Sequence, residues 1–468
     1  MQLKKNIIFN IIYQVVQLLL PLMVTPYVAR VLSPQGVGLY SFSNSIVTYF
    51  GLFIILGVAN YGNRSIAEVS NDKVKRSKVF FEIYFFQIIM GIFVISIYIL
   101  FSLYQKSNFI YFVQIFYLIG LLLDYNWFFS GIERFDITVT RSLVIRILSV
   151  LLIFIFVKSS NDLYKYALIM TIGPLLGQII LIPFLFKNII FIKPNKKGVI
   201  KHIKPNLILF VPVLATSFFT QVDKIMIGKL INTTQVAFYD YSEKIIKIPI
   251  GVITAYNTVM MPRMVNIINH EKEKYNEMFR KSMKVVGFFS IGIFFGLIAV
   301  SKDFINIFYG TNYSECINLT KLFSIYCIIV PWSHTVRMQY LIPFKKDKNY
   351  VSSIVLGALV NFILNSILIR MIGTFGAIIA TLVTEFIILI YQQVGLFKAL
   401  QTKNNVISWM QYLFPGFLML IFIHFLRKLL TSTPVLNLIL EILIGGVIYL
   451  LINLTIFILK NKYLKNYL

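Results

Sequence analysis

The feature that most constrains this chain is a series of long apolar runs, interrupted by short polar stretches, that continues from one end of the sequence to the other. A helix needs roughly 20 mostly apolar residues to cross a bilayer, so each run predicts one span. Of the residues, 58% are hydrophobic and only 13% are charged, whereas soluble domains carry about 25% charged residues. The sequence therefore predicts an all-α polytopic membrane protein. The fourteen spans are predicted at residues 6–31, 40–62, 79–104, 109–131, 139–158, 162–187, 205–231, 236–262, 283–310, 317–343, 350–370, 372–398, 407–426 and 435–460.

The orientation of the spans follows from the distribution of basic residues. The formal net charge is +26, and Lys and Arg gather at the two termini and in the even-numbered loops. Loops rich in Lys and Arg stay in the cytoplasm, so both termini are predicted to be cytoplasmic. This rule explains the positive charge without a nucleic acid partner.

An internal repeat divides the chain. The segment VGLYSFSNSI at Val37 to Ile46 aligns without gaps on VAFYDYSEKI at Val236 to Ile245. Spans 1–6 then correspond to spans 7–12, which predicts two pseudo-symmetric six-helix lobes related by an axis along the membrane normal. The predicted domains are an N-terminal lobe, a basic cytoplasmic linker, a C-terminal lobe and two additional C-terminal helices. Their bounds are 1–187, 188–204, 205–400 and 401–468.

The common catalytic motifs are absent from this sequence. It contains no GxxxxGK[ST], HExxH or GxSxG motif, so ATP hydrolysis and the usual hydrolytic sites have no candidate residues. Cys316 and Cys327 lie eleven residues apart, with no His or further Cys at metal-binding spacing. We therefore expect no enzyme, no metal site and no cofactor, and transport becomes the default function.

Several stretches together resemble one family. It is the family of bacterial flippases for lipid-linked oligosaccharide repeat units, within the multidrug, oligosaccharidyl-lipid and polysaccharide exporter superfamily. The stretches are YVARVLSPQGVGLYSFSNSIVTYF (Tyr27 to Phe50), DYNWFFSGIERF (Asp124 to Phe135), QVDKIMIGKL (Gln221 to Leu230), PRM (Pro262 to Met264) and GTFGAIIATLVTE (Gly373 to Glu385).

This resemblance implies a fold and a cargo. The fold is two six-helix lobes around a central cavity lined with cations, which works by alternating access. The cargo is an undecaprenyl-pyrophosphate-linked oligosaccharide, and no covalent chemistry is implied. A polysaccharide polymerase and glycosyltransferases of the same pathway are the partners to consider, besides membrane lipids. The coupling ion, H⁺ or Na⁺, is left open.

Ionisable residues inside spans are functional candidates, because a charge in the bilayer is costly. In an antiparallel hairpin, residues equally far from the turn share a depth. This rule pairs Asp124 with Arg146. It also pairs Lys224 with Glu243 and Asp223 with Lys244, and the helix spacing offers Asp240 to Lys244 as well.

Two cations have no acid at their own depth in the hairpin, Lys247 and Arg337. They are the first candidates to bind a pyrophosphate headgroup. In the competing interpretation, Glu243 or Glu385 neutralises Lys247 and Arg337 snorkels to the headgroups. Glu385 either balances Lys247 or titrates during transport.

The remaining candidates complete two groups. The predicted substrate-binding residues are Lys247, Arg337, Arg146, Lys224 and Arg30. The predicted coupling or gating residues are Glu385, Asp223, Pro21 and Pro26, the two prolines because a missing amide donor lets the first helix bend. The residues from Arg263 to Lys284 mix apolar and charged residues at helical spacing, which predicts an amphipathic interfacial helix.

Two other functions stay open beside the flippase. A cation-coupled multidrug exporter of the same fold would favour acidic residues in its cavity. A membrane polysaccharide polymerase would share the composition, but short outside loops and the repeat count against it.

Overall fold

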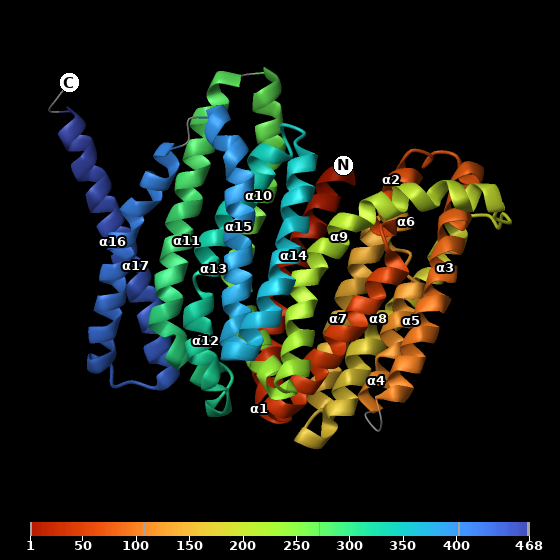
Figure 1. Cartoon of the computed structure of the whole chain (residues 1–468), viewed down its shortest axis with the longest axis horizontal. Helices are drawn as coiled ribbons and strands as arrows, with labels where there is room; N and C mark the ends of the chain where they lie inside the picture. Colours follow the sequence, from red (N-terminus) through yellow and green to blue (C-terminus); the bar gives the residue numbers. More distant parts are fainter. Residues whose placement is uncertain (1, 106–108, 271, 401–402, 466–468) are drawn as a thin grey trace. The chain divides into compact units, whose positions relative to one another are not determined.

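The chain folds as long helices joined by short turns (Figure 1). The computed structural model describes residues 2–105, 109–270, 272–400 and 403–465, with side chains in 20–105, 109–218, 220–268, 274–394 and 409–459. Helices are the expected form, because hydrocarbon offers backbone N–H and C=O groups no partners and a helix bonds them internally.

Contacts divide the chain into two units, Met1–Ala237 and Phe238–Leu468. The predicted lobe boundaries and the linker at 188–204 stay predictions. Unit 1 contains α1 (Gln2–Ile55), α2 (Val58–Ala67), α3 (Lys73–Tyr104), α4 (Phe109–Val113), α5 (Ile115–Leu122), α6 (Asn126–Gly131), α7 (Phe135–Phe156), the 3₁₀ turn η1 (Ser160–Asp162), α8 (Leu163–Asn188) and α9 (Lys196–Leu230).

The helix α10 (Thr233–His270) begins in unit 1 and runs on into unit 2. Unit 2 continues with α11 (Lys272–Phe308), the 3₁₀ turn η2 (Thr311–Tyr313), α12 (Glu315–Phe323), α13 (Tyr326–Val336), the π-helical turn η3 (Arg337–Leu341), α14 (Asp347–Ile372), α15 (Thr374–Leu400), α16 (Lys403–Leu429) and α17 (Pro434–Lys465).

Thirteen helices within the described residues are long and apolar enough to cross a membrane. The first of them, Leu20–Ala67, contains the second predicted span and the last part of the first, so one of these thirteen helices corresponds to two of the fourteen predicted spans. The all-helical polytopic architecture is confirmed.

The first long helix breaks at Ser33, whose φ of 61° lies in the left-handed region. Pro34 follows, and proline restricts the residue before it. The predicted bending points, Pro21 and Pro26, lie inside helical stretches of α1. Their gating role stays a prediction.

The aromatic stretch after Asp124 forms the core of unit 1. Trp127, Phe128 and Phe129 on α6 are at most 3% exposed and pack against Phe80 of α3. The Trp127 Nε1 donates to Gln87 Oε1 at 3.3 Å. The stretch therefore carries a packing role in unit 1.

The predicted interfacial helix at Arg263 to Lys284 is wrong. These residues form the end of α10 and the start of α11, and their apolar side chains Met264, Tyr275 and Phe279 are 0–1% exposed within the core of unit 2. The Tyr275 hydroxyl donates to the carbonyl oxygen of Gln339 at 2.7 Å. The amphipathic pattern reflects packing on η3 and its neighbours, which sequence periodicity cannot distinguish from packing on a membrane.

Candidate functional site

Two ion pairs lie along α10, inside a membrane-length helix. The Lys244 Nζ lies 2.7 Å from Asp240 Oδ2, and the Lys247 Nζ lies 2.5 Å from Glu243 Oε1. Each acid precedes its lysine by four residues, which is the favourable order on a helix. The depth rule, which supplied no partner for Lys247, misses such pairs because it compares only neighbouring helices.

In each of these ion pairs the carboxylate is buried and the lysine is exposed. The carboxylates of Asp240 and Glu243 are 7% and 10% exposed within the protein, while the side chains of Lys244 and Lys247 are 45% and 47% exposed. Ammonium groups inside a membrane face the bundle interior or a water-filled cavity, because exposure to hydrocarbon is costly. We therefore expect this face of α10 to meet water rather than lipid.

A third carboxylate, Glu385 of α15, lies near the same lysine. It is 7% exposed, and the positive charges of Arg337 and Lys247 both act on it. Among the described residues, none donates a hydrogen bond to its carboxylate. The structure thus brings three predicted site residues together in unit 2, from α10, η3 and α15. We call Lys247, Arg337 and Glu385 the Glu385 cluster.

Arg337 occupies an unusual backbone position. It opens the π-helical turn η3, a geometry that is rare and frequent at functional sites. Its guanidinium lies 5.5 Å from the centre of the Tyr350 ring, a cation–π contact. The predicted snorkelling of Arg337 to the headgroups has no support in these contacts, which hold the guanidinium within unit 2.

A buried polar network holds η3 against α10. The Asn257 Oδ1 accepts hydrogen bonds from Thr335 Oγ1 at 3.1 Å and from Gln339 Nε2 at 2.8 Å. All three side chains are fully buried. The two bonds tie η3 and the end of α13 to α10, and so they position the turn that carries Arg337. Within the described residues, Asn257 Nδ2 and Gln339 Oε1 have no hydrogen-bond partner. Sequence reasoning missed this network, since uncharged polar residues are common in membrane helices.

The other predicted residues lie in unit 1. Asp223 is fully buried on α9, and Lys224 next to it is half-buried. Their predicted partners Glu243 and Lys244 belong to unit 2, so those two pairings stay predictions. Arg30 is exposed on α1, and its role in binding substrate stays a prediction.

The predicted pairing of Asp124 with Arg146 is wrong. The Asp124 Oδ1 accepts hydrogen bonds from the Asn126 amide, the Asn126 Nδ2 and Gln178 Nε2, at 2.9, 2.6 and 3.1 Å. The cation that acts on Asp124 is Arg141, which also donates to Asn126 Oδ1 at 2.6 Å. Equal depth did not identify the partner, because Arg141 lies on the side of α7 that faces Asp124. A role for Arg146 in binding substrate stays a prediction.

A second charged cluster in unit 2 joins α11, α16 and α17. Arg427 donates through Nε and Nη2 to the two oxygens of Glu441 at 3.1 Å each, and through Nη2 to the Ala299 carbonyl at 2.8 Å. The same Nη2 lies 2.6 Å from Asp303 Oδ2. We call these three side chains the Arg427 cluster. The position of Arg427 and Glu441 on either side of one hairpin turn is the signal that could have identified it.

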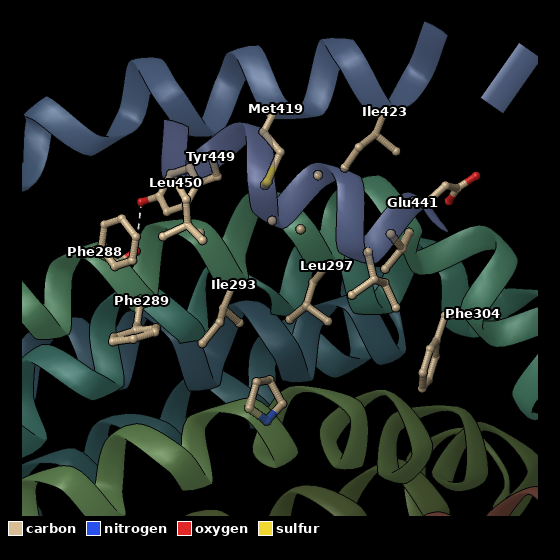
Figure 2. Close-up of a pocket in the computed structure, with 17 residues that line it drawn as sticks. Phe288, Phe289, Ile293, Leu297, Phe304, Met419, Ile423, Glu441, Tyr449 and Leu450 are labelled. Carbon is tan, nitrogen blue, oxygen red and sulfur yellow. Dashed lines mark hydrogen bonds between the residues drawn. The ribbon is translucent and has the colours of Figure 1, made fainter. Parts of the chain in front are cut away.

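Beside the Arg427 cluster lies an apolar cavity of about 470 Å³ (Figure 2). Figure 2 shows Phe288, Ile293 and Leu297 of α11 facing Met419 of α16 and Leu450 of α17, with Glu441 at one end. At the other end the Tyr449 hydroxyl donates to the Phe288 carbonyl at 2.8 Å. Apart from Glu441 and the Tyr449 hydroxyl, the side chains that line the cavity are apolar.

The contact between α11 and α16 is also fixed by close packing. The indole Nε1 of Trp409 donates to the Met283 carbonyl at 2.9 Å, and a Cβ at Gly287 would lie 2.6 Å from that nitrogen. Gly287 therefore admits the Trp409 ring onto α11.

No cluster of three His, Cys, Asp or Glu side chains that could hold a metal occurs among the residues described.

The family model "Polysaccharide biosynthesis protein" matches residues 3–268. Two relatives carry the name "Putative O-antigen transporter". The one from Escherichia coli strain K12 is 22% identical over 83% of this chain and 95% of its own length. The one from Shigella dysenteriae is 24% identical over 83% of this chain and 98% of its own length.

Solved structures share the fold. An inward-facing multidrug resistance MATE family transporter of the MOP superfamily aligns over 85% of this chain and 99% of its own, with a TM-score of 0.58 at 13% identity. The lipid II flippase MurJ in an inward closed conformation aligns over 94% of this chain and 91% of its own, with a TM-score of 0.51 at 19% identity. The chain is therefore a multi-pass membrane protein with a MATE-like and MurJ-like fold.

Proposed function

Because the chain belongs to the polysaccharide biosynthesis protein family, we propose that it is a flippase for a lipid-linked oligosaccharide. It moves an undecaprenyl-pyrophosphate-linked repeat unit from the cytoplasmic to the outer leaflet by alternating access, for assembly of a surface polysaccharide such as capsule, O-antigen or exopolysaccharide. Both termini lie in the cytoplasm. Its relatives named as O-antigen transporters support this cargo class.

The observation that carries the proposal is the water-facing charge of α10 together with the Glu385 cluster. A pyrophosphate headgroup needs cationic donors that are reachable from water, and Lys247 and Arg337 supply an ammonium and a planar guanidinium. Glu243 and Glu385 balance these cations when no headgroup is bound. When a headgroup binds, the two cations exchange their carboxylate partners for the pyrophosphate oxygens. The reverse exchange releases the headgroup on the other side.

The coupling role proposed for Glu385 follows from the same arrangement. Its carboxylate lacks hydrogen-bond donors among the described residues, and its charge is stabilised only by Arg337 and Lys247. A headgroup that draws these cations away leaves a buried carboxylate unbalanced, and such a group takes up a proton more readily. Headgroup binding and proton uptake would thereby be linked.

The experiment compares Lys247→Gln and Arg337→Gln with wild type for membrane abundance and for flipping of a fluorescent lipid-linked oligosaccharide in proteoliposomes. We expect unchanged abundance and at least a tenfold loss of flipping, since each charge-assisted bond is worth about 1.5–3 kcal/mol. Arg280→Gln, which removes an exposed cation of α11 outside both charged clusters, is the matched control.

The same proteoliposomes test the competing function. A multidrug exporter would accumulate a cationic dye, would lose this accumulation in Glu385→Gln, and would be indifferent to Lys247→Gln. Dye transport with this pattern, combined with no flipping by wild type, contradicts the proposal.

A further inference from the structure

The stretch that leads into α9 carries a dense set of exposed lysines. Within residues 193–204, which we call the basic segment, every lysine is exposed. They are Lys193, Lys196, Lys197, Lys201 and Lys204. Acidic residues do not occur in this segment, so its outer surface is strongly positive.

Exposed apolar side chains lie among these lysines and on either side of them in the sequence. Ile200 is 55% exposed and Leu207 is 44% exposed, and their spacing of seven residues places them on one side of the helix. Phe191, just before the helix, is 74% exposed. A positive helix with exposed aliphatic and aromatic side chains is the pattern of a helix that lies in the headgroup layer of an anionic membrane.

The inner face of the same helix is fixed by a buried relay. His202 Nδ1 lies 2.7 Å from the Tyr61 hydroxyl of α2, and His202 Nε2 lies 3.2 Å from Glu82 Oε2 of α3. His202 and Glu82 are 6% and 5% exposed. The two contacts prevent rotation of the helix and so determine which side chains point outward.

A second contact lies one turn further along α9. Asn206 is fully buried, and a Cβ at Gly57 would lie 2.2 Å from its carbonyl oxygen. Val199 and Phe210 pack on the same side, against Leu56 and Phe86. Figure 1 shows the first turns of α9 crossing the ends of the unit 1 helices before α9 turns to run along them. This is the direction that an interfacial helix takes.

We propose that the basic segment is a binding surface for anionic phospholipids. The phosphodiester headgroups contact Lys197, Lys201 and Lys204, while Ile200 and Leu207 insert between the first acyl carbons. The His202 relay holds this surface outward. The inference is independent of the cargo, since it concerns the bilayer lipids around unit 1.

The test places a fluorophore on an Ile200→Cys variant of the full chain; the native Cys316 and Cys327 are fully buried. The protein is reconstituted in phosphatidylcholine vesicles with a minor share of phosphatidylglycerol. In one preparation the phosphatidylglycerol carries brominated acyl chains. In the other, an equal amount of the phosphatidylcholine is brominated instead. One lysine near an anionic surface favours an anionic lipid over a neutral one by about fivefold. Brominated phosphatidylglycerol is therefore expected to quench the fluorophore several-fold more than brominated phosphatidylcholine.

Substitution then separates the basic segment from charge in general. In Lys197→Gln/Lys201→Gln/Lys204→Gln the two brominated lipids are expected to quench equally. The control Arg280→Gln/Lys281→Gln/Lys284→Gln, on α11, is expected to keep the preference. With all lysines present, high salt should abolish the preference for phosphatidylglycerol by screening the charges. This measurement does not depend on the folding of a lysine variant.

Three results would overturn the inference. One is equal quenching by both lipids with all lysines present. Another is an equal loss of preference in the α11 control. The third is no quenching by either lipid, which would place the basic segment in water and favour a soluble acidic partner.

Discussion

Glu441 and Glu385 are both buried carboxylates in unit 2, yet their surroundings differ. Both oxygens of Glu441 accept hydrogen bonds from one guanidinium, which is also bonded to the backbone of α11. Glu385 has two cations acting on it and no hydrogen-bond donor among the described residues. A buried charge with all its bonds made stabilises the fold, whereas one held only by longer-range attraction can exchange partners. The comparison therefore assigns a structural role to the Arg427 cluster and leaves the Glu385 cluster as the candidate functional site.

The largest effect is expected from Arg427→Gln. The substitution leaves Glu441, 1% exposed, without its bidentate partner and frees Asp303, and breaking a buried ion pair costs about 3–5 kcal/mol. We expect a strong fall in membrane abundance and in thermal stability of the purified protein. Normal stability of this variant would mean that the Arg427 cluster is not structural, and the comparison would fail.

One substitution made at both carboxylates sharpens the comparison. Glu441→Gln loses two charge-assisted hydrogen bonds, which are worth about 1.5–3 kcal/mol each, and should unfold at lower temperature. Glu385→Gln replaces a poorly bonded buried charge by a neutral amide and should be as stable as wild type or more stable. Flipping should change only in Glu385→Gln once activity is divided by protein amount.

An opposite ranking of the two glutamine variants in thermal stability would show that Glu385 is the structural carboxylate. The proposed coupling role would then have no basis, although the family membership and the fold would be unaffected.

Part of this picture could be predicted from the sequence. Hydropathy located the spans, and charge inside spans selected Lys247, Arg337 and Glu385 before their proximity was known. The partners could not be predicted, because equal depth says nothing about which way a helix face points. Arg141 and Arg146 lie five residues apart on α7, and only one of them faces Asp124. The π-helical turn at Arg337 depends on a network of uncharged side chains, which has no sequence signature of its own.

The smallest effect on stability is expected at Asp124 of unit 1, a third buried carboxylate to compare with Glu441 and Glu385. Asp124 resembles Glu441 in accepting several hydrogen bonds, but two of its donors come from the neutral Asn126. Double-mutant cycles on purified protein, with Asp124→Asn against Arg141→Gln and against Arg146→Gln, measure the pairwise terms. The first cycle should give a coupling of about 0.5–1 kcal/mol, and the second should be additive within about 0.3–0.5 kcal/mol. A larger coupling to Arg146 would show that equal depth in the hairpin had selected the right partner. Asp124 would then resemble Glu385, whose charge is balanced by cations without a hydrogen bond, rather than Glu441.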